Sequence, residues 1–270
     1  MGDHLEDLLH AVRKGDVSVA DAARALSEGH LPGGKGARID FRRMERTGLP
    51  EIILAEGKDP EDLRKIVEEL SRAHQEVIIS RVSGANRRLL EKLASVGIPL
   101  TFPPRTSLAL LSGQTVTPLR GRVAAVLTAG TADLSVAEEA AIVLSSLGAE
   151  VVRAYDIGVA GLHRLTRALA DPAVQRAQVF VVCAGREGAL PTVVAGLVDR
   201  PIVAIPTSVG YGRGAKGEGA LTAMLQSCAP LAVVNIDGGV PAALVAAQIL
   251  RHLPPAGKKR RGPTKARAGR

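Results

Sequence analysis

The sequence predicts an α/β protein in which a doubly wound parallel sheet forms the C-terminal part and a smaller α/β domain precedes it. The first observation is that residues 119–253 alternate five times between an apolar, strand-like run and a helical pattern. The second is that 46% of the 270 residues are hydrophobic, whereas only 2% are aromatic. The third is the presence of 29 glycines. A core of Ala, Val, Leu and Ile with many glycines is typical of helices packed closely on a parallel sheet.

The first part of the chain is expected to hold an arm and the smaller domain. Residues 1–38 are expected to form a helical N-terminal arm, because leucines recur there at helical spacing. Residues 39–118 are expected to form the α/β domain. Its expected elements are a strand over 51–55, a helix beginning at Asp59 and Pro60, a strand over 76–80, a helix over 85–96 and a third strand over 100–103, with irregular or short-strand material over 104–118. Such a thin unit is expected to pack against the next domain or a partner subunit.

The larger domain is expected over residues 119–253. Its expected strands are 122–128, 150–155, 178–183, 201–205 and 231–236, and its expected helices are 134–147, 162–170, 188–198, 218–228 and 241–252. The first strand runs into Gly130, Thr131, Ala132 and Asp133. This pattern is typical of a buried strand that leads through a phosphate-binding turn into a helix, although a plain core strand bounded by glycine looks the same.

The net charge of +8 arises mostly from the C-terminal tail. Residues 254–270 carry seven Lys and Arg residues and no acid, so the rest of the chain is nearly neutral. We expect this basic tail to be a disordered, solvated extension. Nucleic acid is not an expected partner, because no recognition module accompanies the tail and aromatic stacking surfaces are scarce.

Cysteine content and hydropathy indicate a cytoplasmic protein. The two cysteines, Cys183 and Cys228, lie far apart in the sequence, and free thiols fit a reducing cytosol. Cys183 stands inside an apolar run and is expected in the core. No run of about 18 apolar residues is present, and the N-terminus is charged throughout, so no membrane association is expected.

Small and polar residues gather after each of the five expected strands of the larger domain. In doubly wound sheets, ligands bind at the carboxyl ends of the strands, around the point where the strand order reverses. One such loop would be ordinary turn chemistry, but five together indicate a nucleotide- or phosphate-binding rim. The loops are 129–133, 156–161, 183–188, 206–212 and 235–239.

Motifs along these loops resemble a family of carboxylases. The motifs are AGTAD (129–133), VAEEA (136–140), YDIGVAGLHR (155–164), AGREGALP (184–191), IPTSVGYG (205–212), LQSCA (225–229), VVNIDGG (233–239) and, before them, DFRRMERTGLPEIILAEGKDPE (40–61). They resemble the aminoimidazole-ribonucleotide carboxylase/mutase (PurE) family of purine biosynthesis. The N-terminal motif fits more closely the PurE-related LarB family, the carboxylases of nickel-pincer-nucleotide cofactor synthesis.

The resemblance implies a fold, a reaction and partners. The fold is a flavodoxin-like, three-layer sandwich, and the superfamily forms octamers, so a homo-octamer is expected. The reaction is carboxylation of nicotinic acid adenine dinucleotide at C5 of its pyridinium ring, together with cleavage of its phosphoanhydride. The products are AMP and pyridinium-3,5-biscarboxylic acid mononucleotide. The carbon source is CO2 or bicarbonate without biotin, and a divalent cation such as Mg2+ is expected, with no ligands assigned.

This chemistry requires a nucleophile and a base. A pyridinium ring is too electron-poor at C5 to attack CO2, but addition of a thiolate at C6 makes C5 nucleophilic. Cys228 matches the family's cysteine and is the expected nucleophile; the alternative is a buried core thiol. Asp156 is the expected base for the C5 proton, and Glu187 an acid–base or orienting group. The alternative for both carboxylates is helix capping.

The substrate-binding residues implied by the resemblance lie on the same loops. Thr131 with the backbone of 129–133 is expected to cradle a phosphate, and Asp133 to cap a helix or to hold a metal or ribose. Arg164 is expected to bind a substrate carboxylate, and Lys58 to bind the adenylate half, although a solvated surface lysine is the alternative. The remaining expected contacts are Gly130, Gly158, Gly185, Thr207, Ser208 and Gly210.

Two departures from the family pattern keep other functions open. Ala132 stands where the family has Ser, and Gly238, Gly239, Val240 and Pro241 replace its usual Asn-Gly-Phe-Gly. One alternative is therefore a nucleotide-binding protein without catalysis. Another is the aminoimidazole-ribonucleotide carboxylase or mutase of purine synthesis.

Overall fold

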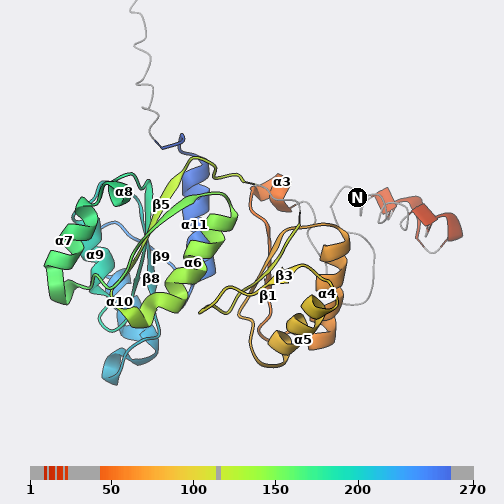
Figure 1. Cartoon of the computed structure of the whole chain (residues 1–270), viewed down its shortest axis with the longest axis horizontal. Coiled ribbons are helices and arrows are strands. Elements are labelled where there is room, and N and C mark those ends of the chain that lie inside the picture. The colour runs from red at the N-terminus through yellow and green to blue at the C-terminus, as the bar shows by residue number, and fades with distance from the viewer. Residues whose placement is uncertain are drawn as a thin grey trace, which may run out of the picture. The chain divides into compact units, whose positions relative to one another are not determined.

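The chain divides into two compact units, Met1–Val116 and Thr117–Arg270 (Figure 1). The computed structural model describes residues 9–10, 12–15, 17–20, 22–23, 43–113 and 117–256, without the side chains of Glu45 and Arg213. Of the expected arm, residues 9–10, 12–14, 19–20 and 22–23 are helical. The rest of that arm, and the expected tail beyond residue 256, lie outside the described residues.

The first unit contains a mixed four-stranded sheet in the order β1-β2-β4-β3. β1 and β2 are parallel, and β4 is antiparallel to both β2 and β3. Its elements are α3 (Arg43–Thr47), β1 (Glu51–Leu54), α4 (Pro60–Arg72), β2 (Val77–Ser80), α5 (Gly84–Ser95), β3 (Leu100–Thr101) and β4 (Ala109–Leu111). α4 begins where expected, because the Asp59 side chain accepts a hydrogen bond from the Glu61 N–H and Pro60 occupies the first turn. β4 arises in the stretch that the sequence predicts only as irregular or short-strand material.

The second unit contains five parallel strands in the order β6-β5-β7-β8-β9. The strands are β5 (Val123–Thr128), β6 (Glu150–Ala154), β7 (Val179–Ala184), β8 (Ile202–Pro206) and β9 (Ala232–Val233). This is the flavodoxin-like order, and it confirms the predicted doubly wound fold. β9 is shorter than the expected 231–236, because the chain turns at Asn235, whose side chain accepts a hydrogen bond from the Ile236 N–H.

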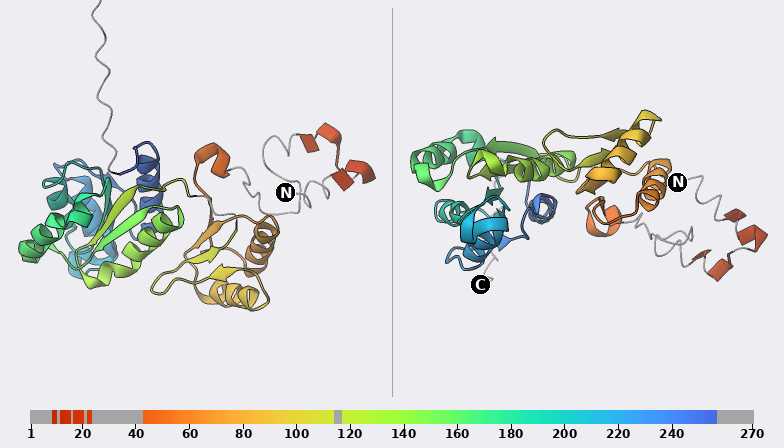
Figure 2. Two further views of the ribbon diagram at one scale, coloured as in Figure 1. Left: turned by 45° about the horizontal axis from the view of Figure 1, so that its top comes forward. Right: turned by 90° about the horizontal axis from the view of Figure 1, so that it is seen from below.

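Helices cover both faces of this sheet in a three-layer sandwich (Figures 1 and 2). α6 (Leu134–Ser146) and α11 (Gly239–Arg251) pack on one face and against each other. The opposite face carries α7 (Leu162–Ala170), α8 (Pro172–Gln175), α9 (Ala189–Ala195) and α10 (Glu218–Leu225). α8 was not expected; Asp171 caps its N-terminus by accepting from the Ala173 N–H, and Pro172 follows as its first residue.

Small apolar side chains build the core of the second unit. α6 and α11 bury mainly alanines toward the sheet, which lets these helices lie close to the strands and to each other. Every residue of β5, β7 and β8 is buried, as expected for strands covered on both faces. Cys183 is among them, which confirms its expected place in the core; burial raises the pKa of its thiol. Within the described residues, no helix has the length and apolar content needed to cross a bilayer.

Candidate functional site

The strand order places the candidate site at the carboxyl ends of β5 and β7. The chain passes from β5 to β6 on one side and then returns across β5 to β7 on the other, so the two loops diverge there. Such a switch point is where flavodoxin-like sheets bind their ligands. The loop after β5 begins at Ala129 and continues through the 3-10 turn η1 (Thr131–Asp133), and the loop after β7 holds Gly185 to Gly188.

Asp133 links the loops that follow β5, β7 and β8. Its side chain is buried, and its Oδ1 accepts a hydrogen bond from the Thr207 hydroxyl at 2.6 Å. Its Oδ2 accepts from the Gly130 N–H at 2.9 Å, and the Gly185 N–H donates to the same carboxylate. Burial raises the pKa of Asp133, while these hydrogen bonds act in the opposite direction. The fold therefore uses this carboxylate to hold the three loops together, and its expected contact with a metal or ribose stays a prediction.

Two glycines on the rim are required by close backbone contacts. A Cβ on Gly185 would lie 2.2 Å from the Val209 carbonyl oxygen, and one on Gly158 would lie 2.6 Å from the Ala129 carbonyl oxygen. Neither position tolerates a side chain without movement of backbone. Gly158 and Gly185 therefore shape the rim by joining neighbouring loops.

Asp156 and Arg164 form an exposed ion pair after β6. The Arg164 guanidinium donates to Asp156 Oδ2 at 2.8 Å, and the two side chains are 41% and 50% exposed. Asp156 has a left-handed backbone, with φ of 57°, and its N–H donates to the buried Thr128 hydroxyl at 3.0 Å. Asp156 does not cap a helix; its carboxylate faces solvent beside a cation. It is thus available to accept a proton from a ligand.

Glu187 lies in the loop after β7. This loop is on the opposite side of β5 from Asp156, which follows β6. Its side chain is exposed, and α9 begins at the next residue but one without a side-chain cap. Beside it, the Arg186 guanidinium lies over the Tyr211 ring, 4.9 Å from the ring centre, and donates to the Tyr211 hydroxyl at 2.9 Å. Arg186 too has a left-handed backbone, with φ of 51°. The sequence alone predicts no role for this Arg–Tyr pair.

The expected phosphate-binding residues differ in how accessible they are. Thr131 is exposed at the start of η1, and Ser208 is exposed after β8, with its N–H donating to Asp237 Oδ1 at 2.8 Å. Thr207 is fully buried and already donates to Asp133. Gly210 sits in the same loop as Ser208. Among the hydroxyls expected to contact substrate, Thr131 and Ser208 are therefore the ones open to a ligand.

Cys228 lies at the other edge of the sheet. It follows α10, which runs back from the end of β8, and it precedes β9, so it is placed where the strands begin. Its thiol is exposed and not part of the core. The neighbouring Ser227 hydroxyl accepts from the Thr192 hydroxyl at 2.9 Å and from the Ala229 N–H at 3.1 Å. Within one chain, the structure does not bring Cys228 to Asp156 and Glu187.

Lys58 belongs to the first unit, in the turn between β1 and α4. Its N–H donates to the Ala55 carbonyl at 3.1 Å, and its own carbonyl accepts from the Asn86 side chain at 3.2 Å. Its side chain is half-buried. The expected contact of Lys58 with the adenylate half of the substrate stays a prediction.

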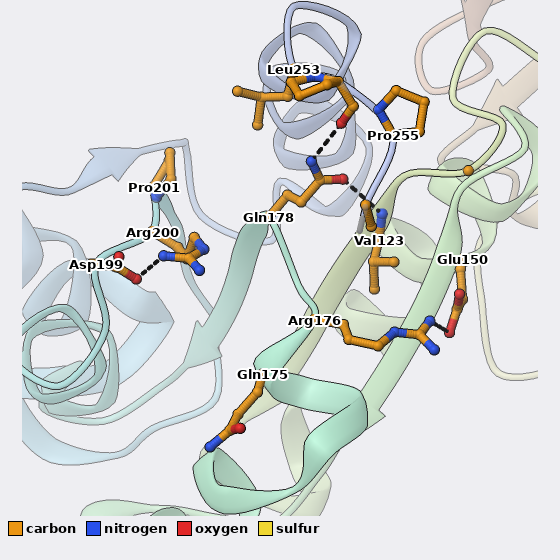
Figure 3. A pocket seen from close by; sticks show the side chains of 13 residues that line it. Val123, Glu150, Gln175, Arg176, Gln178, Asp199, Arg200, Pro201, Leu253 and Pro255 are labelled. Atoms are coloured by element: carbon orange, nitrogen blue, oxygen red, sulfur yellow. Dashed lines mark hydrogen bonds and ion pairs between the residues drawn. The ribbon is translucent and has the colours of Figure 1, made fainter. Parts of the chain in front are cut away.

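A hollow of about 1000 Å³ lies at the amino-terminal edge of the second sheet (Figure 3). Its charged side chains are paired with each other, as Arg176 is with Glu150 and Arg200 with Asp199. The Gln178 amide is used on both sides, accepting from the Val123 N–H and donating to the Pro254 carbonyl. Because these polar groups serve the fold, and because ligands of such sheets bind at the opposite edge, we do not assign the candidate site here.

Comparison with known proteins identifies the family. The AIR carboxylase family model matches residues 123–260, and the model of a LarB/PurE-like N-terminal domain matches residues 33–96. An uncharacterised protein of Methanocaldococcus jannaschii is 35% identical over 257 residues, which are 93% of this chain and 98% of that protein. The chain belongs to the LarB/PurE-related family.

Two relatives with a stated activity each cover less than half of this chain. The N5-carboxyaminoimidazole ribonucleotide mutase of the same organism is 38% identical over 125 residues, covering 44% of this chain and 72% of the mutase. A probable mutase of Methanothermobacter thermautotrophicus is 33% identical over 131 residues, covering 46% of this chain and 37% of that protein. These matches support an enzyme of the carboxylase and mutase class.

The described residues were searched for side chains that could bind a divalent cation. In the part of the chain that the structure describes, no three His, Cys, Asp or Glu side chains cluster as metal ligands would. Asp133, the buried carboxylate nearest the switch point, is engaged by donors of the fold. The divalent cation that the resemblance implies stays a prediction.

Proposed function

We propose that this chain carboxylates the pyridinium ring of nicotinic acid adenine dinucleotide at C5 and hydrolyses its phosphoanhydride. The products would be pyridinium-3,5-biscarboxylic acid mononucleotide and AMP. The observation that carries the proposal is the placement of two exposed carboxylates, Asp156 and Glu187, on either side of the switch-point loop that presents Thr131. The LarB/PurE-like N-terminal domain, joined to a carboxylase-type sheet, supports a pyridine nucleotide over a purine precursor.

The proposed reaction uses a thiolate to reverse the polarity of the ring. The Cys228 thiolate forms a bond to C6, and the ring electrons pass to N1, which gives a neutral dihydropyridine whose C5 is nucleophilic. C5 attacks CO2 and forms the new carbon–carbon bond. Asp156 takes the C5 proton, the C6–sulfur electrons return to sulfur, and the ring becomes aromatic again. Glu187 orients the carboxylates or exchanges a proton with them.

The position of Cys228 requires a second copy of the chain in this scheme. The thiol is exposed at the edge opposite to the two carboxylates, so we propose that Cys228 of one copy completes the site of another within an octamer. Co-expression of Cys228→Ser chains with Asp156→Asn chains tests this arrangement. Mixed oligomers should recover part of the activity that each variant lacks alone, whereas inactivity of mixed oligomers would contradict a shared site.

Mg2+ or a similar cation is proposed to act on the phosphates of the substrate. When bound there, it would neutralise charge on the phosphoanhydride as water attacks phosphorus. Thr131 and Ser208 supply the exposed hydroxyls that would position those phosphates. CO2 or bicarbonate supplies the carbon, and no biotin is involved.

Turnover with two candidate substrates tests the proposed function. The purified chain is incubated with bicarbonate and Mg2+ and with either nicotinic acid adenine dinucleotide or N5-carboxyaminoimidazole ribonucleotide, the substrate that the name of the related mutase states. We expect AMP release with the dinucleotide and no rearrangement of the N5-carboxylated ribonucleotide. The 38% identity to a mutase of purine synthesis favours the second candidate function, which the opposite result would establish.

A further inference from the structure

We propose that Tyr211 provides the face on which the substrate's pyridinium ring stacks, and that Arg186 then moves from Tyr211 to a carboxylate of that substrate. This inference rests on the proposed function, because it assigns a contact within the same site. It is carried by the exposed Arg186–Tyr211 pair and by the hollow that this pair borders.

Tyr211 is an unusual side chain for its position. The whole chain contains two Tyr, three Phe and no Trp, yet the Tyr211 side chain is 73% exposed. The other aromatic residue beside the strand-end loops, Tyr155, is half-buried and donates its hydroxyl to Glu138 at 2.7 Å. The exposed ring beside the candidate acid Glu187 is available to stack with a planar ligand.

The surroundings of Tyr211 leave room for a planar ring. A hollow of about 420 Å³ is lined by Arg186, Glu187, Tyr211, Gly214, Gly219 and Ala223. Three of these six residues are glycine or alanine, so few large side chains line the hollow. A ring placed on Tyr211 would lie in this hollow next to the Glu187 carboxylate.

The loops that carry the pair are held together by backbone contacts. The Arg186 N–H donates to the Val209 carbonyl at 2.8 Å, which joins the loop after β7 to the loop after β8. A Cβ on Gly210 would lie 2.5 Å from the Gly214 carbonyl oxygen, and one on Gly214 would lie 3.2 Å from the Arg186 carbonyl oxygen. The fold therefore fixes the two backbone positions from which the guanidinium and the phenol ring meet.

The chemistry of the pair matches a cationic aromatic ligand that also carries carboxylate. A guanidinium is a planar cation, and it lies over the electron-rich face of the ring. A pyridinium is likewise a planar cation and can take the same place. The displaced guanidinium gains a better partner, since Arg binds carboxylates through two parallel hydrogen bonds. A ligand with both groups satisfies both side chains.

Tyrosine fluorescence gives a direct reading of this contact, because the chain has no Trp and only two Tyr. Tyr155→Phe leaves Tyr211 as the single tyrosine emitter. In that variant, nicotinic acid mononucleotide should quench the emission, after correction for ligand absorbance, with the same Kd that calorimetry gives. ADP-ribose, which lacks the pyridine ring, is the control ligand and should leave the emission unchanged.

Substitution of Tyr211 completes the test. Tyr211→Leu should raise the Kd for nicotinic acid mononucleotide about tenfold, whereas Tyr211→Phe should stay within about threefold, because the ring face is retained. The Kd for ADP-ribose should not change in either variant. If calorimetry shows wild-type binding of the mononucleotide that Tyr211→Leu does not weaken, the stacking role is wrong and the proposed function stands. If the wild-type chain binds neither the mononucleotide nor nicotinic acid adenine dinucleotide, the proposed function itself is wrong.

Discussion

Removal of the Asp133 carboxylate should destabilise the second unit by a predictable amount. Asp133→Ala leaves the Thr207 hydroxyl and the Gly130 N–H without the acceptor that they contact at 2.6 and 2.9 Å, and the Gly185 N–H loses the same acceptor. Thr207 is fully buried and cannot turn to water, while Gly130 is partly exposed and can. An unsatisfied buried donor costs about 1–3 kcal/mol and the loss at a hydrated amide costs less, so we expect a total of about 2–4 kcal/mol.

Urea-induced unfolding followed by circular dichroism measures this loss, and a second substitution tests its cause. Thr207→Val removes the donor together with the need for an acceptor. In the Asp133→Ala background it should therefore cost little, which gives an interaction energy of about 1–2 kcal/mol in a double-mutant cycle. Asp156→Asn is the matched control, because its exposed ion pair contributes at most about 1 kcal/mol. A loss below that of the control, or additive effects of the two substitutions, would refute the assigned role of Asp133.

Three further results follow from the described geometry. Gly185→Ala should destabilise the chain by about 2–3 kcal/mol, because the new Cβ meets the Val209 carbonyl, whereas Gly130→Ala should change the free energy of unfolding by less than about 0.5 kcal/mol; urea unfolding of both variants compares them. Burial raises the pKa of Asp133, so the stability linked to its proton is lost as the pH rises from the ordinary carboxyl value of 3.8 through the folded value; Asp133→Asn should flatten this part of the stability–pH curve. Cys228→Ser should abolish carboxylation while calorimetry still shows dinucleotide binding, and full activity in this variant would exclude the thiolate mechanism.

The sheet of the second unit could be predicted because its signals are local. Each buried strand is a short apolar run, and each is followed by glycine and then by a helical pattern, as at Gly130 and Gly185. The predicted ends of β9, α9 and α10 were wrong by a few residues, since local turns, such as the one at Asn235 after β9, end these elements early. β4 was not specified, because three apolar residues acquire strand geometry only by pairing with β2 and β3.

The candidate site was less predictable because its contacts join distant loops. The hydrogen bond between Asp133 and Thr207 spans 74 residues, and nothing in either loop alone indicates it. The Arg186–Tyr211 pair likewise depends on β7 and β8 being neighbours. The position of Cys228 at the amino-terminal edge could have been inferred, since it stands between a helix and the next parallel strand.

Identification of the products shows whether the chain carboxylates the pyridinium ring. The chain is incubated with nicotinic acid adenine dinucleotide, Mg2+ and carbon-13-labelled bicarbonate. The products are separated, and their masses are measured by mass spectrometry. We expect AMP together with a mononucleotide that is heavier than nicotinic acid mononucleotide by one labelled carboxylate. Release of AMP together with an unlabelled mononucleotide, or recovery of the intact dinucleotide, would contradict carboxylation by this chain.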